Sequence, residues 1–115
     1  MSRGELWWLD FDPSVGTEVG KRRPALIVGR DALVRATLEH ARGTVTVVPV
    51  TSSVTKVYPF HVFLPARTGG LERDSKAQAE QIRTVSVARL VERIGKVPER
   101  VSREVDAAIR LYLGL

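Results

Sequence analysis

Hydrophobic residues fall into short runs separated by turn-forming residues, a pattern that predicts a small, mainly β protein. Residues 4–11 (GELWWLDF) are rich in aromatic and aliphatic side chains and predict a first strand. Residues 23–29 (RPALIVG) form an almost continuous apolar run and predict a buried strand. Because proline cannot donate a ladder hydrogen bond, we expect Pro24 at the first residue of that strand or on a sheet edge.

Four further segments predict strands, and one predicts a helical turn. The strand segments are residues 43–52 (GTVTVVPVTS), where Pro49 can form a bulge, 60–64 (FHVFL), 76–87 (KAQAEQIRTVSV) and 90–97 (LVERIGKV). Asp31 can cap a short helical turn that runs through Val34. Residues 12–21 (DPSVGTEVGK) join the first two strands and contain two glycines and a proline, which is typical of a functional loop.

The hydrophobic period changes near the C-terminus. Apolar side chains recur there every three or four residues, which places them on one face of a helix: Val101, Val105, Ala108, Ile109 and Tyr112. Pro98 suits the first position of this helix, and Gly114 suits its C-terminal cap. Five or six short, mostly antiparallel strands and one closing helix make a mainly β (α+β) fold. We expect residues 1–115 to form one domain, a small curled sheet or partly open barrel.

Composition adds a basic charge and removes several kinds of chemistry. The net charge is +5, from 18 lysines and arginines against 13 acidic residues, which favours an acidic partner, either a nucleic acid or an acidic protein. There is no cysteine, and therefore no disulfide and no thiolate nucleophile. No segment resembles a signal peptide or approaches the ~18 apolar residues of a membrane span. We expect a soluble, cytoplasmic protein without a membrane partner.

The familiar catalytic and metal-binding arrangements are missing from the sequence. His40 and His61 are too few and too poorly placed for a metal site, and no phosphate-binding or nucleophile motif occurs. In the FHVFL segment a structural or solvent-facing His61 is favoured over a catalytic one. Glu72 and Asp74 fit a turn better than a carboxylate metal site. We therefore expect neither a metal nor another cofactor.

A basic cluster remains as the candidate for chemistry. Lys21, Arg22 and Arg23 stand consecutively where the loop meets the second strand. A rigid element at this junction can direct the Arg23 guanidinium, whose planar fork matches phosphate oxygens. Lys21 and Arg22 are about equally consistent with phosphate contacts and with solvated loop charges.

Cleavage of RNA without metal is one reaction that this residue set could support. The ribose 2′-hydroxyl must attack the adjacent phosphorus, and the protein must stabilise the negative charge that develops. Arg23 can stabilise that charge, Thr51 or Ser52 can add a hydrogen bond, and Glu18 can accept a proton or hold the arginine. The Thr51-Ser52-Ser53 run is also an ordinary turn composition.

Three blocks of the sequence resemble the MazF/PemK/Kid toxins. The first is RGELWWLDFDPSVGTEVGKRRPALIVG, the second VVPVTSS, and the third GLERDSKAQAEQIRTVSVARLVERIGKV, which is followed by a terminal helix ending in LGL. The order and spacing match along nearly the whole chain. The resemblance implies an SH3-like barrel, a homodimer, a cognate antitoxin, and metal-independent, sequence-specific cleavage of single-stranded RNA that leaves 2′,3′-cyclic phosphate and 5′-hydroxyl ends.

The resemblance also implies roles for individual residues. Arg23 matches the main catalytic residue, Thr51 the catalytic hydroxyl, and Glu18 a loop glutamate implicated in some members. The residues that we expect to bind RNA are Thr17, Lys21, Arg22, Ser52, Glu80, Gln81 and Arg83.

Several departures from the family pattern stand out. Arg22 precedes Arg23 where relatives often have a small or neutral residue, and Thr17-Glu18-Val19 stands where many have Ser-Glu-Gln. Some members use an aspartate and a further arginine in the third block, where this chain has Glu80 and Gln78.

Two alternatives keep the fold and change the function. One is a gyrase-inhibiting toxin like CcdB, and the other is an RNA-binding barrel without activity, for which log K should fall linearly with log salt while RNA stays intact. Adjacent Trp7 and Trp8 must point to opposite faces of their strand, so one of them packs against a dimer partner or a covering helix.

Overall fold

The computed structural model describes residues 2–11, 22–31, 33–34 and 43–115. These residues form seven strands, three short 3-10 helices and a C-terminal α-helix. In chain order the elements are β1 (Glu5–Asp10), β2 (Arg22–Ile27), β3 (Thr44–Thr51), β4 (His61–Leu64), η1 (Thr68–Gly70), β5 (Ser75–Gln78), η2 (Ala79–Gln81), β6 (Arg83–Ser86), η3 (Val87–Arg89), β7 (Leu90–Lys96) and α2 (Glu99–Leu113). No helix among these residues is long and apolar enough to cross a membrane.

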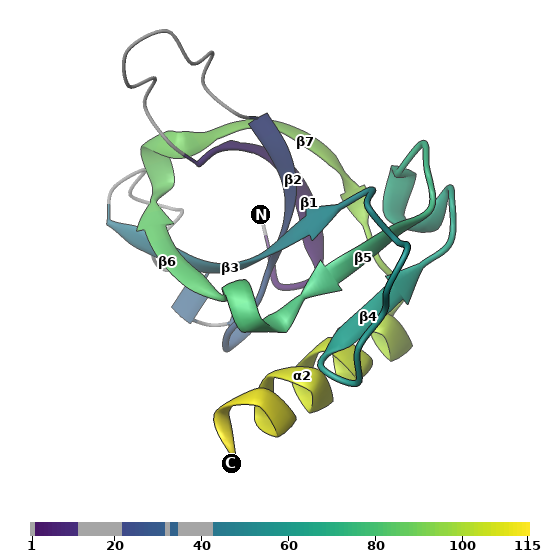
Figure 1. Cartoon of the computed structure of the whole chain (residues 1–115). Coiled ribbons are helices and arrows are strands. Elements are labelled where there is room, and N and C mark those ends of the chain that lie inside the picture. Colours follow the sequence, from purple (N-terminus) through teal and green to yellow (C-terminus); the bar gives the residue numbers. More distant parts are fainter. Residues whose placement is uncertain (1, 12–21, 32, 35–42) are drawn as a thin grey trace, which may run out of the picture.

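The strands form one antiparallel sheet that curls around a common centre (Figure 1). Its order is β4-β5-β3-β2-β1-β7, and β6 pairs with β3 beside β5. Within the described residues β6 and β7 do not pair with each other, so the sheet stays open. A partly open antiparallel barrel with a C-terminal helix is therefore confirmed.

Two apolar clusters hold the fold together. The first lies between the sheet and α2, and includes Leu6, Leu26 and Leu64 from the strands and Val105 from the helix. The second lies inside the curl of β1, β2, β3 and β6 and is centred on Leu9 and Val47. Leu6, Leu9, Val47 and Val105 have no exposed surface, so each strand contributes inward residues to one core or the other.

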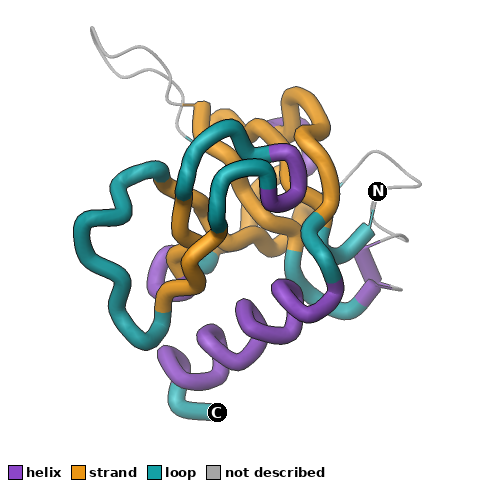
Figure 2. Tube along the Cα trace, turned by 90° about the vertical axis from the view of Figure 1, so that its right-hand side faces the viewer, coloured by secondary structure: helices purple, strands orange, loops and turns teal. Residues whose placement is uncertain are grey.

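Helix α2 lies along one side of the sheet rather than within it (Figure 2). The predicted apolar face packs inward through Val101, Val105 and Ala108. Gly114 takes a left-handed conformation with φ of 74°, and its N–H bonds to the last-turn carbonyls, so the predicted C-cap is confirmed. Pro98 is the N-cap and not the first helical residue, so the helix begins at Glu99, one residue later than predicted.

Residues 76–87 contain parts of two strands where the sequence predicts one. β5 and β6 are separated by η2, and both pair with the same edge of β3. Val47 has its partner in β6 and Val50 has its partner in β5, so Pro49 lies in the gap between the two ladders. The predicted bulge at Pro49 is wrong, because Pro49 pairs with Ala25 in regular register and needs no partner on its other side.

Two smaller expectations meet different outcomes. Pro24 is the third residue of β2 and not the first, but pairing with β3 begins only at the next residue, Ala25. The helical turn at Asp31 is present where the chain is described, since the amides of Leu33 and Val34 both donate to the Arg30 carbonyl.

Candidate active site

A cleft of about 670 Å³ opens where β2 begins and β3 ends. Arg22, Arg23, Thr51 and Ser52 all line it, so the structure brings these four predicted residues together. The opposite walls come from β1, from the segment that follows η1, and from β7. The cleft is therefore bounded by residues from five separate parts of the sequence.

Arg23 and Thr51 lie on adjacent strands at matching positions. β2 pairs with β3 through Ala25–Pro49, Leu26–Val48 and Ile27–Val47. Extending this register by two residues sets Arg23 opposite Thr51. Directly opposed residues in an antiparallel pair have Cβ atoms about 5 Å apart, so a guanidinium and a hydroxyl can act on the same group.

The neighbouring arginines differ in how they are held. The Nε of Arg22 lies 3.1 Å from Asp10 Oδ1, in an exposed ion pair. The side chain of Arg23 makes no hydrogen bond or ion pair within the described part of the chain. The Thr51 hydroxyl oxygen accepts the Ser53 amide at 3.2 Å, which leaves its proton available for donation. Arg23 and Thr51 thus both present unused donors to the cleft.

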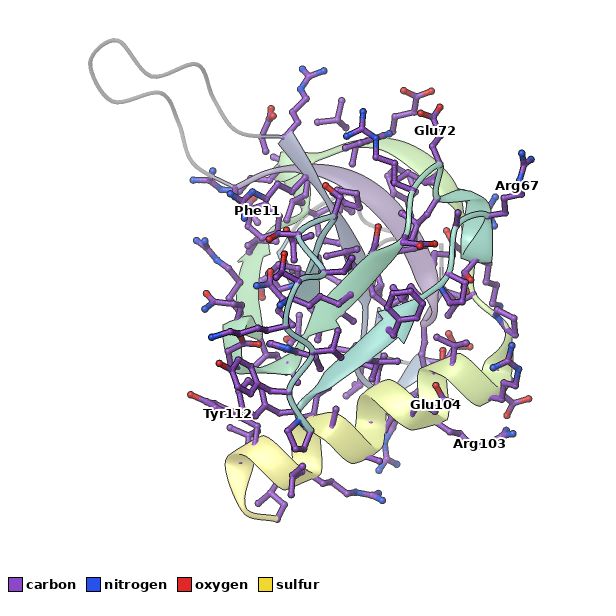
Figure 3. The ribbon with its side chains drawn as sticks, turned by 45° about the vertical axis from the view of Figure 1, so that its right-hand side comes forward. Phe11, Arg67, Glu72, Arg103, Glu104 and Tyr112 are labelled. Carbon is purple, nitrogen blue, oxygen red and sulfur yellow. The ribbon has the colours of Figure 1, made fainter. Side chains whose placement is uncertain are left out.

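The wall formed by Gly70, Leu71 and Arg73 stands close to β7 because two backbones touch. A Cβ atom on Gly95 would lie only 2.1 Å from the Gly69 carbonyl oxygen, so only glycine permits this approach. The same segment carries Glu72, which is drawn at the rim of the molecule in Figure 3.

Arg93 enters the cleft from β7 and is positioned by a buried carboxylate. Its Nε donates to Glu5 Oε1 at 3.1 Å, and Trp7 Nε1 donates to the same oxygen, also at 3.1 Å. Burial raises the pKa of Glu5, but the hydrogen bonds from Trp7, Ser2 and Arg93 outweigh burial, and its pKa lies below the ordinary value. Glu5 is therefore a charged anchor that orients Arg93.

Sequence reasoning missed Arg73 and also three lining residues of β1 and β7, which are Trp8, Glu92 and Arg93. β1 pairs with β7 across more than eighty residues of sequence, and this pairing brings all three to the cleft. One signal in the sequence points to this pairing. Charged residues interrupt the apolar pattern of β7, and they are exposed in the structure.

Glu80, Gln81 and Arg83 lie elsewhere. None of them lines the cleft, and each belongs to η2 or β6. Glu80 Oε2 bonds to His61 Nε2 at 2.9 Å, while its Oε1 is buried without a hydrogen-bond partner among the described residues. The Arg83 guanidinium lies 5.5 Å from the centre of the Phe11 ring.

His61 has a structural environment, as the sequence favoured. Its side chain is 3% exposed, and its Nδ1 accepts the Tyr58 amide at 3.0 Å. That contact puts the ring proton of the neutral imidazole on Nε2, which donates to Glu80.

Thr17, Glu18, Lys21 and His40 lie outside the described residues. Within the described ranges no group of three or more His, Cys, Asp or Glu residues could hold a metal ion.

Residues 2–113 match the model of the PemK-like, MazF-like toxins of type II toxin-antitoxin systems. The chain belongs to this family. It is 47% identical to Endoribonuclease MazF9 of Mycobacterium tuberculosis, over 100% of this chain and 98% of that protein. It is 34% identical to Endoribonuclease EndoA of Bacillus subtilis, over 100% of this chain and 96% of that protein.

Solved structures agree with the assignment to this toxin family. MazF from Deinococcus radiodurans matches with a TM-score of 0.76 and 34% identity, over 100% of this chain and 97% of that chain. A MazE–MazF structure from the same organism matches with a TM-score of 0.74 and 32% identity, over 100% of this chain and 96% of that chain. The chain is a toxin of the MazF type and has the fold of these relatives, and the family's enzymes are endoribonucleases.

Proposed function

We propose that this toxin cleaves single-stranded RNA at specific sequences in the cleft between β2, β3 and β7, without a metal ion. Arg23 and Thr51 are the catalytic residues within the described part of the chain. The observation that supports this assignment is the β2–β3 register, which ends at Ala25–Pro49 and, extended by two residues, would bring Arg23 opposite Thr51; both residues line the cleft.

The reaction begins when the ribose 2′-hydroxyl attacks the adjacent phosphorus. The bond between O2′ and phosphorus forms, the 2′-hydroxyl proton leaves, and negative charge builds on the non-bridging oxygens. Arg23 donates to these oxygens, and the Thr51 hydroxyl adds a further hydrogen bond. Glu18, which lies outside the described residues, is assigned as the acceptor of the 2′-hydroxyl proton.

The second half of the reaction breaks the bond between phosphorus and O5′. The departing oxygen takes up a proton and leaves as a 5′-hydroxyl, while the phosphate remains as a 2′,3′-cyclic diester. Arg23 stays bonded to the phosphate oxygens through both halves. The charge therefore remains compensated from attack to product.

The residues around this pair bind the substrate. Arg22, Ser52, Arg73 and Arg93 line the same cleft and can donate to the RNA backbone. We also assign Lys21 and Thr17, which lie outside the described residues, to RNA binding. Glu80, Gln81 and Arg83 stay assigned to RNA contacts outside the cleft.

The proposal extends to the assembly and location of the toxin. Complexes of MazF with MazE have been solved for Deinococcus radiodurans, and we assign a cognate antitoxin of this kind to the present toxin. We also assign a homodimer in the cytoplasm as the state in which the toxin acts.

Cleavage of a long single-stranded RNA in EDTA tests the proposal. Wild type should give discrete fragments with cyclic phosphate ends. Arg23→Ala should lose about 10²- to 10³-fold in rate, as for removal of one donor to a developing oxyanion, and Thr51→Ala about 10- to 100-fold. Arg103→Ala is the control, because it removes the same charge from the outer side of α2, away from the cleft (Figure 3).

Either of two results would contradict the proposal. Intact RNA at every concentration of folded wild type would remove the nuclease activity. Equal loss of cleavage in Arg23→Ala and Arg103→Ala would show that only net charge matters.

A further inference from the structure

Trp8 is an exposed aromatic side chain inside the cleft. It is 39% exposed, whereas Leu6 and Leu9 of the same strand are fully buried. Among the described lining residues it is the only aromatic one. A tryptophan gains more than most residues from burial, so its exposure in a concave site indicates a surface that a ligand covers.

The neighbours of Trp8 define a small subsite. In the sheet register Trp8 pairs with Pro24 of β2 on one side and with Glu92 of β7 on the other. All three residues line the cleft, and Pro24 directly follows Arg23. An apolar ring surface thus stands beside a carboxylate, while Arg23 pairs with Leu9 and directs its side chain to the other face of the sheet.

A nucleobase fits this arrangement chemically. Unpaired bases stack on aromatic side chains, and each base has a flat face that can do so. The side chain of Glu92 makes no hydrogen bond or ion pair within the described part of the chain, so its carboxylate is available as an acceptor. Cytosine and adenine carry an exocyclic amino donor on their pairing edge. Uracil has carbonyl oxygens on both sides of its single N–H, and these repel a carboxylate.

We propose that Trp8 stacks on a base of the bound RNA strand and that Glu92 accepts a hydrogen bond from the amino group of this base. The subsite makes the cleft select a base with an exocyclic amino group at that position. The inference rests on the proposed nuclease function, because that function makes RNA the ligand of the cleft. Its test uses binding alone, so the two can fail separately.

Binding of a 2′-O-methyl oligocytidylate 12-mer measures the stacking. The blocked 2′-hydroxyl cannot attack, so the probe stays intact while its Kd is measured by fluorescence anisotropy. Trp8→Leu should weaken binding about 5- to 150-fold, and Trp8→Phe should restore most of it. The slope of log Kd against log salt should not change, because no charge is removed.

Tyr112→Leu is the matched control for Trp8→Leu. Tyr112 is 49% exposed, and it lies at the opposite end of the molecule from Glu72 of the cleft (Figure 3). Its replacement should leave Kd unchanged. Thermal unfolding of each variant shows that the protein remains folded at the assay temperature.

A second probe that differs only in the base edge measures the role of Glu92. Wild type should bind 2′-O-methyl oligocytidylate more tightly than the matching oligouridylate. Glu92→Gln should bind both probes more tightly, because a negative charge is lost, but should lose the preference between them. Glu99→Gln removes a carboxylate from the exposed start of α2 and should keep the preference.

The outcomes separate the two claims. Equal binding by wild type and Trp8→Leu, or an unchanged preference in Glu92→Gln, overturns the subsite even if RNA is cleaved. Wild type that binds the probes with the expected preference but leaves unmodified RNA intact supports the subsite and refutes the nuclease.

Discussion

Replacing Gly95 by alanine tests whether a backbone contact sets the wall of the cleft. The added Cβ atom would lie 2.1 Å from the Gly69 carbonyl oxygen and 2.8 Å from its carbonyl carbon. Real Cβ atoms essentially never come closer than 3.0 Å to another atom, so strand β7 and the η1 turn must separate by about 0.9 Å. The obstacle is backbone, which cannot rotate aside as a flexible side chain could.

The cost follows from this overlap. Overpacking typically costs about 1–3 kcal/mol, and a backbone neighbour places Gly95→Ala near 3 kcal/mol. Alanine restricts the unfolded chain and offsets about 0.5–1 kcal/mol, which leaves a net loss of about 2 kcal/mol. At roughly 4 °C per kcal/mol for a chain of this size, Tm should fall by about 8 °C.

The same displacement should reach the chemistry. The η1 turn leads directly into Leu71, Glu72 and Arg73, which line the cleft beside Arg23. A misplacement of about 1 Å can cost up to 10²-fold in rate, so we expect cleavage to fall at least tenfold at a temperature where the variant is folded.

Calorimetry and cleavage assays measure the two effects. Gly114→Ala is the control, since its φ is 74° but no atom lies within 4 Å of the added Cβ. It should lose only about 1 kcal/mol for the left-handed conformation and keep the wild-type rate. A Gly95→Ala variant with wild-type Tm and cleavage rate would refute the reasoning.

Three further predictions concern the scaffold. The pKa of Glu5 lies below its ordinary value of 4.5 in the folded protein, so its negative charge stabilises the fold above that pH. Glu5→Gln should therefore be less stable than wild type at pH 7. The difference in the free energy of unfolding between the two proteins should shrink below about pH 4 in urea titrations. Val105→Ala, at a fully buried site, should cost about 2 kcal/mol, whereas Leu111→Ala, at a residue 59% exposed, should cost under about 0.5 kcal/mol. His61→Phe removes the donor to Glu80, whose other carboxylate oxygen is buried without a hydrogen-bond partner among the described residues, and should cost about 1–3 kcal/mol. Glu80→Met should recover much of this loss in the double variant, and additive losses would contradict the reasoning.

The presence of Arg23 and Thr51 in one cleft could be predicted because the place of each follows from a local pattern. Both residues stand at the end of a strongly apolar run, one where β2 begins and one where β3 ends. Antiparallel neighbours bring such ends to the same edge of the sheet. The helix α2 was also readable, since its period and its glycine cap are local signals.

Other parts of the site depend on contacts between distant residues, which the pattern does not encode. Trp8 and Glu92 meet because β7 closes against β1, and single-sequence periodicity does not give the order of strands. The assignment of Glu80 to RNA comes from its place in a motif, and the pattern does not encode the bond between one of its oxygens and His61. Pro49 was expected to bulge, and the split of the neighbouring edge between β5 and β6 makes a bulge unnecessary.

The charges of the cleft explain how affinity for the RNA backbone can be separated from selection of a base. Its described lining holds four arginines and two glutamates: Arg22, Arg23, Arg73, Arg93, Glu72 and Glu92. Arginines alone would bind any RNA backbone, since phosphate contacts carry no sequence information. Each carboxylate lowers the affinity for every backbone, and only a base that donates a hydrogen bond compensates for that loss. Since Asp10 engages Arg22 and Glu5 engages Arg93, the attraction that remains uncompensated within the described residues is concentrated at Arg23 and Arg73. Under this proposal the cleft holds a strand loosely along its length and firmly only where Trp8 and Glu92 accept the base.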